Sequence, residues 1–192
     1  MIAKNQPKPA NTKVPPPPPD FSAIDNDFLQ ILLAQARASA ARQSQDRLAG
    51  WNKAIQPRLE TQSISSLDAE ILAHAEKQAA SEVARLEANL RHAIARANAV
   101  AGRPTAVPLL AVVEPAPPSN EDAPGLELFE KDVVPRGQEL LKKLFQSYSV
   151  SGVSISELLW QERQATQVEM NYRVWAVTAA FEATVNASSG GR

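Results

Sequence analysis

The fold is decided by residues 65–104, which read SSLDAEILAHAEKQAASEVARLEANLRHAIARANAVAGRP. Apolar residues recur in this stretch at steps of four and occasionally three, a spacing that places their side chains on one face of an α-helix. A narrow apolar stripe about eight turns long predicts packing against another long helix. The stripe consists of Leu67, Ile71, Ala75, Ala79, Val83, Leu86, Leu90, Ile94 and Ala97.

Both ends of this helix carry sequence signals. Ser65 or Ser66 can cap its N-terminus, and Asp68 places a negative charge in the first turn, where the helix dipole favours it. Gly102 followed by Pro104 is typical of a helix C-terminus. The sequence therefore predicts where this helix begins and ends.

A second helix is predicted before it, from Asp25 to about Ile55, with Ser22 or Asp25 as the N-cap. Pro57 is expected to end it, because proline lacks the N–H that the helix needs. The polar segment 61–66 then forms a turn. The apolar face of this helix consists of Phe28, Leu29, Leu32, Leu33, Ala36, Ala40 and Leu48.

The C-terminal half repeats the same order of features. A helix is predicted from about Leu126 to Tyr148, with a kink at Pro135, and a serine-rich break follows at residues 149–153. Ser154 or Ser156 can cap a last helix that runs to about Ala187. The apolar faces of the two helices are Leu126, Phe129, Val133, Leu140, Leu141, Leu144, Phe145 and Tyr148, then Leu158, Trp160, Ala165, Val168, Tyr172, Trp175, Ala179 and Phe181.

The predicted fold is thus all-α: two long antiparallel helical hairpins, a coiled-coil-like repeat, at residues 23–103 and 125–187. The sequence lacks segments of about ten residues with alternating polarity, so no β-barrel strands are expected. A Pro-rich leader at 1–22 is expected to be disordered or to bind a proline-recognising domain. Residues 104–124 are expected to be a Pro-rich linker, with one edge strand at 107–113 as the alternative, and residues 188–192 a flexible tail.

Composition excludes several classes of function. The 20 basic and 21 acidic residues give a net charge of −1, so nucleic acid is not an expected partner. The chain has no cysteine, which excludes disulfides and Cys-based zinc sites. It contains neither an apolar run long enough to span a membrane nor the apolar region of a secretory signal, so a cytoplasmic location stays open.

No catalytic or metal-binding pattern stands out. His74 and His92 are the two histidines, and on one straight helix they would lie about 27 Å apart, too far to share a metal. Glu70 and His74 at i, i+4 resemble half a metal site, but we interpret them as polar side chains on the exposed side of the helix. The serines of the two turns are explained by capping. We expect no enzyme activity, no metal and no cofactor.

Two stretches carry a resemblance to a known family. Residues 58–72, RLETQSISSLDAEIL, followed by a long helix ending Ala101-Gly-Arg-Pro104, resemble a periplasmic hairpin of TolC-like outer-membrane efflux proteins. Val134-Pro135, then residues 148–159, YSVSGVSISELL, and Arg163 resemble the second hairpin of the heavy-metal efflux branch. The resemblance covers residues 25 to 187, with specific motifs at the two turns and the Gly-Arg-Pro ending.

This resemblance implies a trimeric component of the outer membrane and periplasm. Its helices would form part of a tunnel, and its hairpin tips would dock to a periplasmic adaptor protein that leads to an inner-membrane pump. The implied adaptor contacts are Arg58, Ser63, Ile64, Ser65 and Asp68 in the first turn and Tyr148, Gly152, Val153, Ser154 and Glu157 in the second. The chain departs from the family in having no signal peptide, no barrel strands and no glycine in its first turn. The alternative is a soluble coiled-coil interaction protein that has lost transport.

Overall fold

The computed structural model describes residues 21–111, 123–150 and 152–189, and within these ranges the chain forms helices and no strand. Most of the predicted leader and linker, and the end of the tail, lie outside the described residues. The all-α prediction is confirmed. The elements are α1 (Phe21–Glu60), α2 (Ser66–Val100), α3 (Ala123–Leu128), a π-helical turn η1 (Phe129–Val133), α4 (Val134–Ser149) and α5 (Ile155–Ser189).

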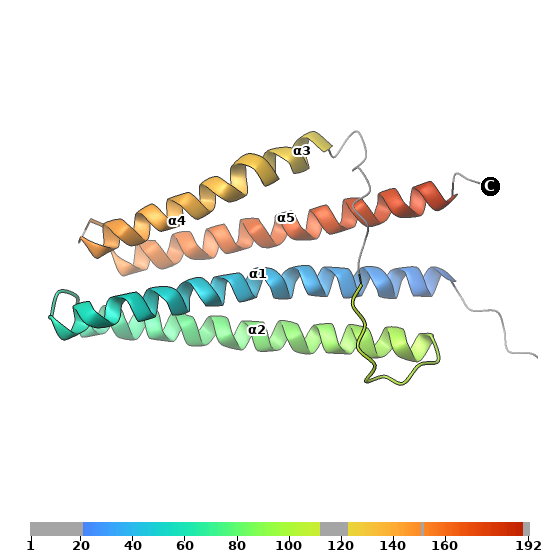
Figure 1. Cartoon of the computed structure of the whole chain (residues 1–192), viewed down its shortest axis with the longest axis horizontal. Coiled ribbons are helices and arrows are strands. Elements are labelled where there is room, and N and C mark those ends of the chain that lie inside the picture. Colours follow the sequence, from blue (N-terminus) through green and yellow to red (C-terminus); the bar gives the residue numbers. More distant parts are fainter. Residues whose placement is uncertain (1–20, 112–122, 151, 190–192) are drawn as a thin grey trace, which may run out of the picture.

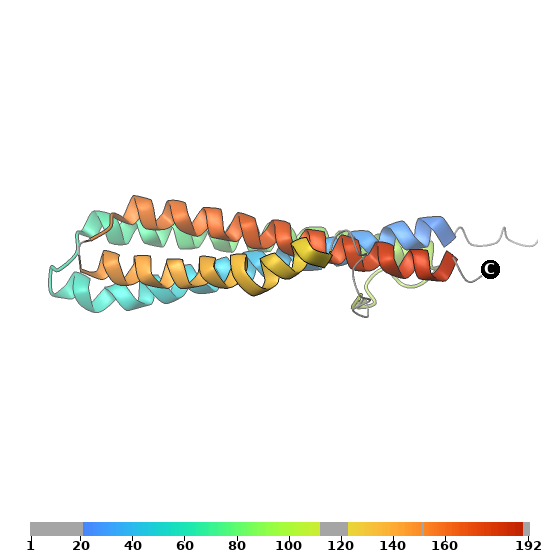
Figure 2. The ribbon, with the colours of Figure 1, turned by 90° about the horizontal axis from the view of Figure 1, so that it is seen from above.

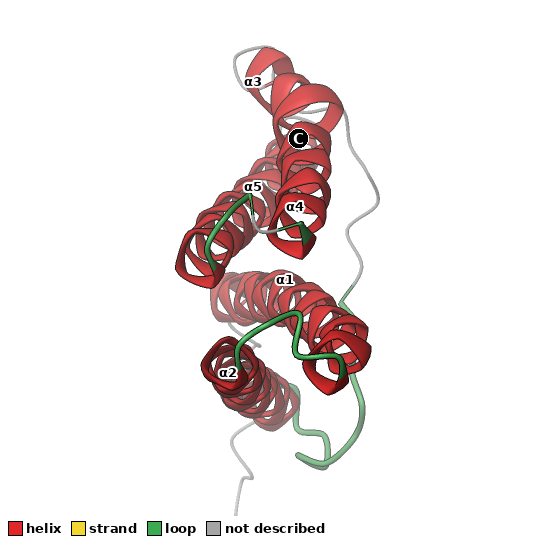
Figure 3. Cartoon of the chain, turned by 90° about the vertical axis from the view of Figure 1, so that its left-hand side faces the viewer, coloured by secondary structure: helices red, strands yellow, loops and turns green. Residues whose placement is uncertain are grey.

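The long helices form two antiparallel pairs that lie on each other lengthwise (Figure 1, Figure 2). Helix α1 packs most extensively against α2 and next against α5, and α4 packs against α5. The turn between α1 and α2 and the turn between α4 and α5 lie at the same end of the molecule, on the left in Figure 1 and facing the viewer in Figure 3. The two hairpins therefore present their turns side by side.

The interior is divided into separate apolar clusters along the length of the molecule. The cluster nearest the turns, called here the tip core, takes residues from α1, α2, α4 and α5. Its buried members are Leu48, Ile55, Ala69, Leu72, Ala75, Tyr148, Ile155, Leu158 and Leu159. A small middle cluster joins α1 and α2, and a third cluster at the opposite end is built around Ile31 and Leu32. The tip core is the place where all four long helices share one interior.

Helix α1 is longer at both ends than predicted. It begins at Phe21, so Ser22 and Asp25 lie inside the helix and do not cap it, and it continues through Pro57 to Glu60. Ile55 is 1% exposed and Leu59 packs against the tip core, on either side of the proline. Burial of these side chains outweighs the local cost of one missing helical hydrogen bond.

The irregularity expected at Pro135 takes the form of the π-helical turn η1, which ends immediately before α4. A widened turn here accommodates a residue that has no N–H to donate and whose ring crowds the preceding turn. Proline then occupies the first turn of α4, the helical position that tolerates it best. The alternative edge strand is wrong over its described part, because residues 107–111 form no strand.

Three residues predicted on packing faces are exposed. Leu67 is 62%, Leu140 48% and Trp160 54% exposed. Tyr172 and Trp175 of the same predicted face do pack: the ring of Tyr172 stacks on Phe129, and Trp175 meets the same ring edge-on. None of the helices in the described ranges has an apolar stretch of the length that crossing a membrane requires.

Candidate functional site

An open cleft lies between the two turns, with a volume of about 630 Å³. Its walls come from the α1–α2 turn and the start of α2 on one side, and from the α4–α5 turn and the start of α5 on the other. The lining residues are Ser63, Ile64, Ser65, Leu67, Asp68, Ile71, Tyr148, Gly152, Val153, Ser154, Ile155 and Ser156. We call it the tip cleft, and it lies at the end of the molecule that holds the tip core.

The first turn is built by hydrogen bonds that end α1. The N–H of Ser63 donates to Arg58 O at 2.8 Å, and that of Gln62 donates to Leu59 O at 3.0 Å. This pair of bonds is the Schellman arrangement, which requires a left-handed residue at its centre. Gln62 takes that conformation with φ 56°, at a position that glycine usually fills. Ser65 then starts α2, and its Oγ accepts from Asp68 N at 3.0 Å.

The second turn follows the same plan. The N–H of Gly152 donates to Ser147 O at 2.8 Å, and the Oγ of Ser154 accepts from Glu157 N at 3.1 Å. A Cβ placed on Gly152 would lie 3.3 Å from Ser147 O, so the turn approaches the end of α4 closely at this point. Of the predicted alternatives, Ser65 and Ser154 are the two caps.

Two contacts join the turns across the cleft. Arg58 donates from Nη1 to Ser149 O, a carbonyl in the last turn of α4. Tyr148 Oη approaches Asp68 Oδ2 at 3.5 Å, a long hydrogen bond. Burial raises the pKa of the Tyr148 hydroxyl above its ordinary value of 10, and the neighbouring Asp68 carboxylate raises that pKa further. The tyrosine therefore stays protonated and able to donate.

The tip has its own charge balance. Two helix N-termini, those of α2 and α5, meet there, and each has a carboxylate in its first turn, Asp68 and Glu157. Such carboxylates offset the positive end of a helix dipole. The C-terminal end of α1 carries Arg58, which offsets the negative ends of α1 and, through Ser149, of α4. The Asp68 carboxylate lines the cleft, and the outer rim is formed by exposed serines.

The structure brings the predicted contact residues of both turns together. Eight of the ten line the tip cleft, Arg58 bridges to the second turn, and Glu157 lies in the first turn of α5, where its carboxylate accepts from Gln161 Nε2 at 2.9 Å. Sequence reasoning missed four lining residues, Leu67, Ile71, Ile155 and Ser156, the last of which was considered only as a cap. Leu67 and Ile71 had been placed on the packing stripe of α2, since periodicity alone does not show where the partner helix ends.

The described residues contain no group of three or more His, Cys, Asp or Glu side chains that could hold a metal ion. His74 is exposed on α2, and its Nε2 lies 2.9 Å from Gln78 Nε2. The tip cleft presents hydroxyls, apolar side chains and the Asp68 carboxylate, with no histidine among its lining residues.

Comparison of the chain with protein-family models, with curated proteins and with solved structures finds no significant match.

Proposed function

We propose that this chain is the periplasmic helical-tunnel part of a TolC-like outer-membrane efflux component, and that it docks to a periplasmic adaptor through the tip cleft. The observation that carries the proposal is the juxtaposition of the two turns, which are 85 or more residues apart in the sequence and line one cleft.

The composition of the cleft supports a protein partner that is itself a helical tip. Its rim offers the hydroxyls of Ser63, Ser154 and Ser156, all exposed, and its floor offers half-buried Ile64 and Val153. A small apolar floor surrounded by hydroxyls, with the Asp68 carboxylate beside Tyr148, fits the polar end of another helical hairpin better than it fits an anionic ligand. The adaptor in turn would link the chain to an inner-membrane pump, which would select the transported substrate.

Trimer formation belongs to the same proposal. The hairpins of one chain form only two layers, and a closed tunnel needs several copies side by side. In the alternative, a soluble coiled-coil interaction protein, the same cleft would bind a partner without any tunnel.

The test compares two valines of the second turn. Val153 lines the tip cleft, whereas Val150 is 78% exposed and is not among its lining residues. We expect Val153→Asp to reduce crosslinking to a co-expressed periplasmic adaptor at least tenfold, because the cleft would gain a desolvated charge. Val150→Asp should leave crosslinking unchanged, and circular dichroism should show equal helicity in both variants. Undetectable crosslinking to the adaptor in the unmodified chain would refute the efflux proposal.

A further inference from the structure

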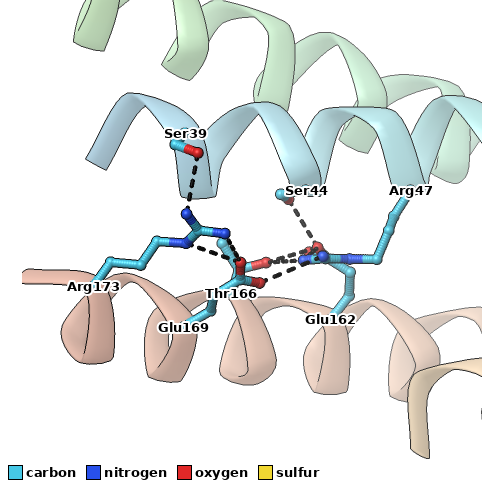
Figure 4. A network of polar contacts seen from close by, with 7 residues as sticks. All are labelled: Ser39, Ser44, Arg47, Glu162, Thr166, Glu169 and Arg173. Carbon is cyan, nitrogen blue, oxygen red and sulfur yellow. Dashed lines mark hydrogen bonds and ion pairs between the residues drawn. The ribbon is translucent and has the colours of Figure 1, made fainter. Parts of the chain in front are cut away.

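The interface between the two hairpins is polar at its centre. Among the α5 side chains between Leu159 and Ala179, only Glu162 and Glu169 are buried, with 3% and 4% exposure. They lie seven residues apart and face α1 (Figure 4). These are positions that packed helices normally fill with apolar side chains, so the carboxylates need a specific explanation.

Glu162 is held by three donors. Its Oε1 accepts from Ser44 Oγ at 2.8 Å, from Arg47 Nη2 at 3.1 Å and from Thr166 Oγ1 at 2.8 Å. The same nitrogen of Arg47 also donates to Thr166 Oγ1 at 2.8 Å. Ser44 and Arg47, which lie one helical turn apart on α1, thus both donate hydrogen bonds to the same carboxylate of α5.

Glu169 extends the network toward the opposite end of the molecule. Its Oε1 accepts from Arg173 Nη2 at 2.8 Å, and its Oε2 lies 3.7 Å from Arg47 Nη1. Arg173 then donates from Nη1 to Ser39 Oγ at 3.2 Å, which returns the network to α1. The network comprises Ser39, Ser44 and Arg47 of α1 and Glu162, Thr166, Glu169 and Arg173 of α5, with two positive and two negative charges (Figure 4).

The neighbouring apolar surface of α1 is smooth. Its buried residues from position 36 to position 41 are alanines, namely Ala36, Ala38, Ala40 and Ala41. Ala38 and Ala41 belong to the middle cluster with α2. The larger apolar side chains that α1 and α5 share lie toward the two ends, in the tip core and around Ile31 and Leu32, so the small side chains in the middle of α1 do little to fix the axial position of α5. The polar network is different, because a slide of one turn, about 5.4 Å, would separate every donor on one helix from its acceptor on the other, namely Ser44 and Arg47 from Glu162, Arg47 from Thr166, and Arg173 from Ser39.

The network is also expected to stabilise the folded chain no more than apolar side chains of similar size would. The buried Nε of Arg47 has no hydrogen-bond partner, which carries a desolvation cost. Replacing buried ion pairs by apolar side chains of similar size is often neutral or stabilising. Specificity of packing is the better-attested role for buried polar groups at helix interfaces.

We propose that this network sets the axial register of α5 on α1 and thereby holds the two turns level, so that they form a single tip cleft. Ser44, Arg47, Glu162 and Glu169 are in this sense positioning residues, which act on the cleft through the helices. The inference concerns how the cleft is built and holds whatever partner docks there.

The test measures register and stability separately. Spin labels at Gln30→Cys on α1 and Arg163→Cys on α5, in a chain that has no other cysteine, report the sliding of the helices by double electron–electron resonance. The apolar variant combines Arg47→Met, Glu162→Leu, Glu169→Leu and Arg173→Met. The control makes the same kinds of change in two exposed ion pairs, with Arg85→Met, Glu82→Leu, Lys131→Met and Glu127→Leu.

We expect the unmodified chain and the control to give one narrow distance. The apolar variant should keep its Tm, or raise it, and give a broadened distribution or a second distance shifted by about 5.4 Å. One unchanged narrow distance in the apolar variant would overturn the proposal. Loss of folding, or a strongly lowered Tm, would overturn it as well, because the network would then act on stability and not on register.

Discussion

At the scale of single residues, the C-termini of α1 and α2 both need a residue in the left-handed conformation, and different residue types fill the two positions. Gly102 ends α2 with φ 66°, and Gln62 ends α1 with φ 56°. Each of the two helix ends has its own Schellman pair of backbone hydrogen bonds. The glycine was predicted from the sequence, because glycine followed by proline marks a helix end. The left-handed glutamine was not, since no local signal distinguishes it from a helical glutamine.

Gln62→Gly should stabilise the protein. A residue with a Cβ pays about 1–2 kcal/mol in the left-handed region, and part of this gain is offset by the greater freedom of glycine in the unfolded chain. We expect the free energy of unfolding in urea to rise by about 0.5–1 kcal/mol. Gln62→Ala keeps the Cβ and should give no such gain, and Gly102→Ala should destabilise. Equal effects of Gln62→Gly and Gln62→Ala would show that no strain is stored at this turn.

Because of its two tyrosines, we expect the free energy of unfolding of the protein to fall at high pH. Burial raises the pKa of Tyr148 and of Tyr172, so the folded chain holds their protons more tightly than the unfolded chain does. Their contribution is complete below pH 10 and is lost as pH rises through the higher folded-state pKa values. Between pH 9 and 11 we expect the free energy of unfolding to fall less in a Tyr148→Phe/Tyr172→Phe variant than in the unmodified chain. Parallel pH profiles would contradict this.

At the scale of elements, apolar periodicity predicted the helices well and their limits less well. The end of α2 was predicted correctly, because its signals are local. The end of α1 was not, because the continuation through Pro57 depends on the packing of Leu59 against the tip core, which residues of both hairpins build. A local signal of helix termination was overridden by packing that a single segment does not reveal.

Two glycines in helices should respond to alanine with opposite sign. A Cβ on Gly50 in α1 would meet no atom within 4 Å, so Gly50→Ala should stabilise the protein by about 0.5–1 kcal/mol. A Cβ on Gly125 in α3 would lie 2.4 Å from the ring of Trp175, so Gly125→Ala should destabilise it by about 1–3 kcal/mol and alter tryptophan fluorescence. The comparison by urea denaturation fails if both changes have the same sign.

At the scale of the whole molecule, the repeat predicted two hairpins, and the resemblance selected the turn residues that the structure brings to one cleft. The buried network was not predicted. Glu162 and Glu169 read as ordinary charges on a long helix, and their burial follows from the approach of Arg47 on a helix more than a hundred residues away. Sequence periodicity describes the faces of helices but not which faces meet.

The most direct test of the central claim, that the two turns form one docking surface, is photo-crosslinking from single positions. A photoreactive residue would replace Ser63 in the first turn, Ser156 in the second, or Glu182, an exposed residue near the opposite end of α5. We predict that Ser63 and Ser156 both crosslink to the same periplasmic adaptor and that Glu182 does not. Crosslinking from only one turn, or equally from all three positions, would contradict a docking surface shared by the two turns.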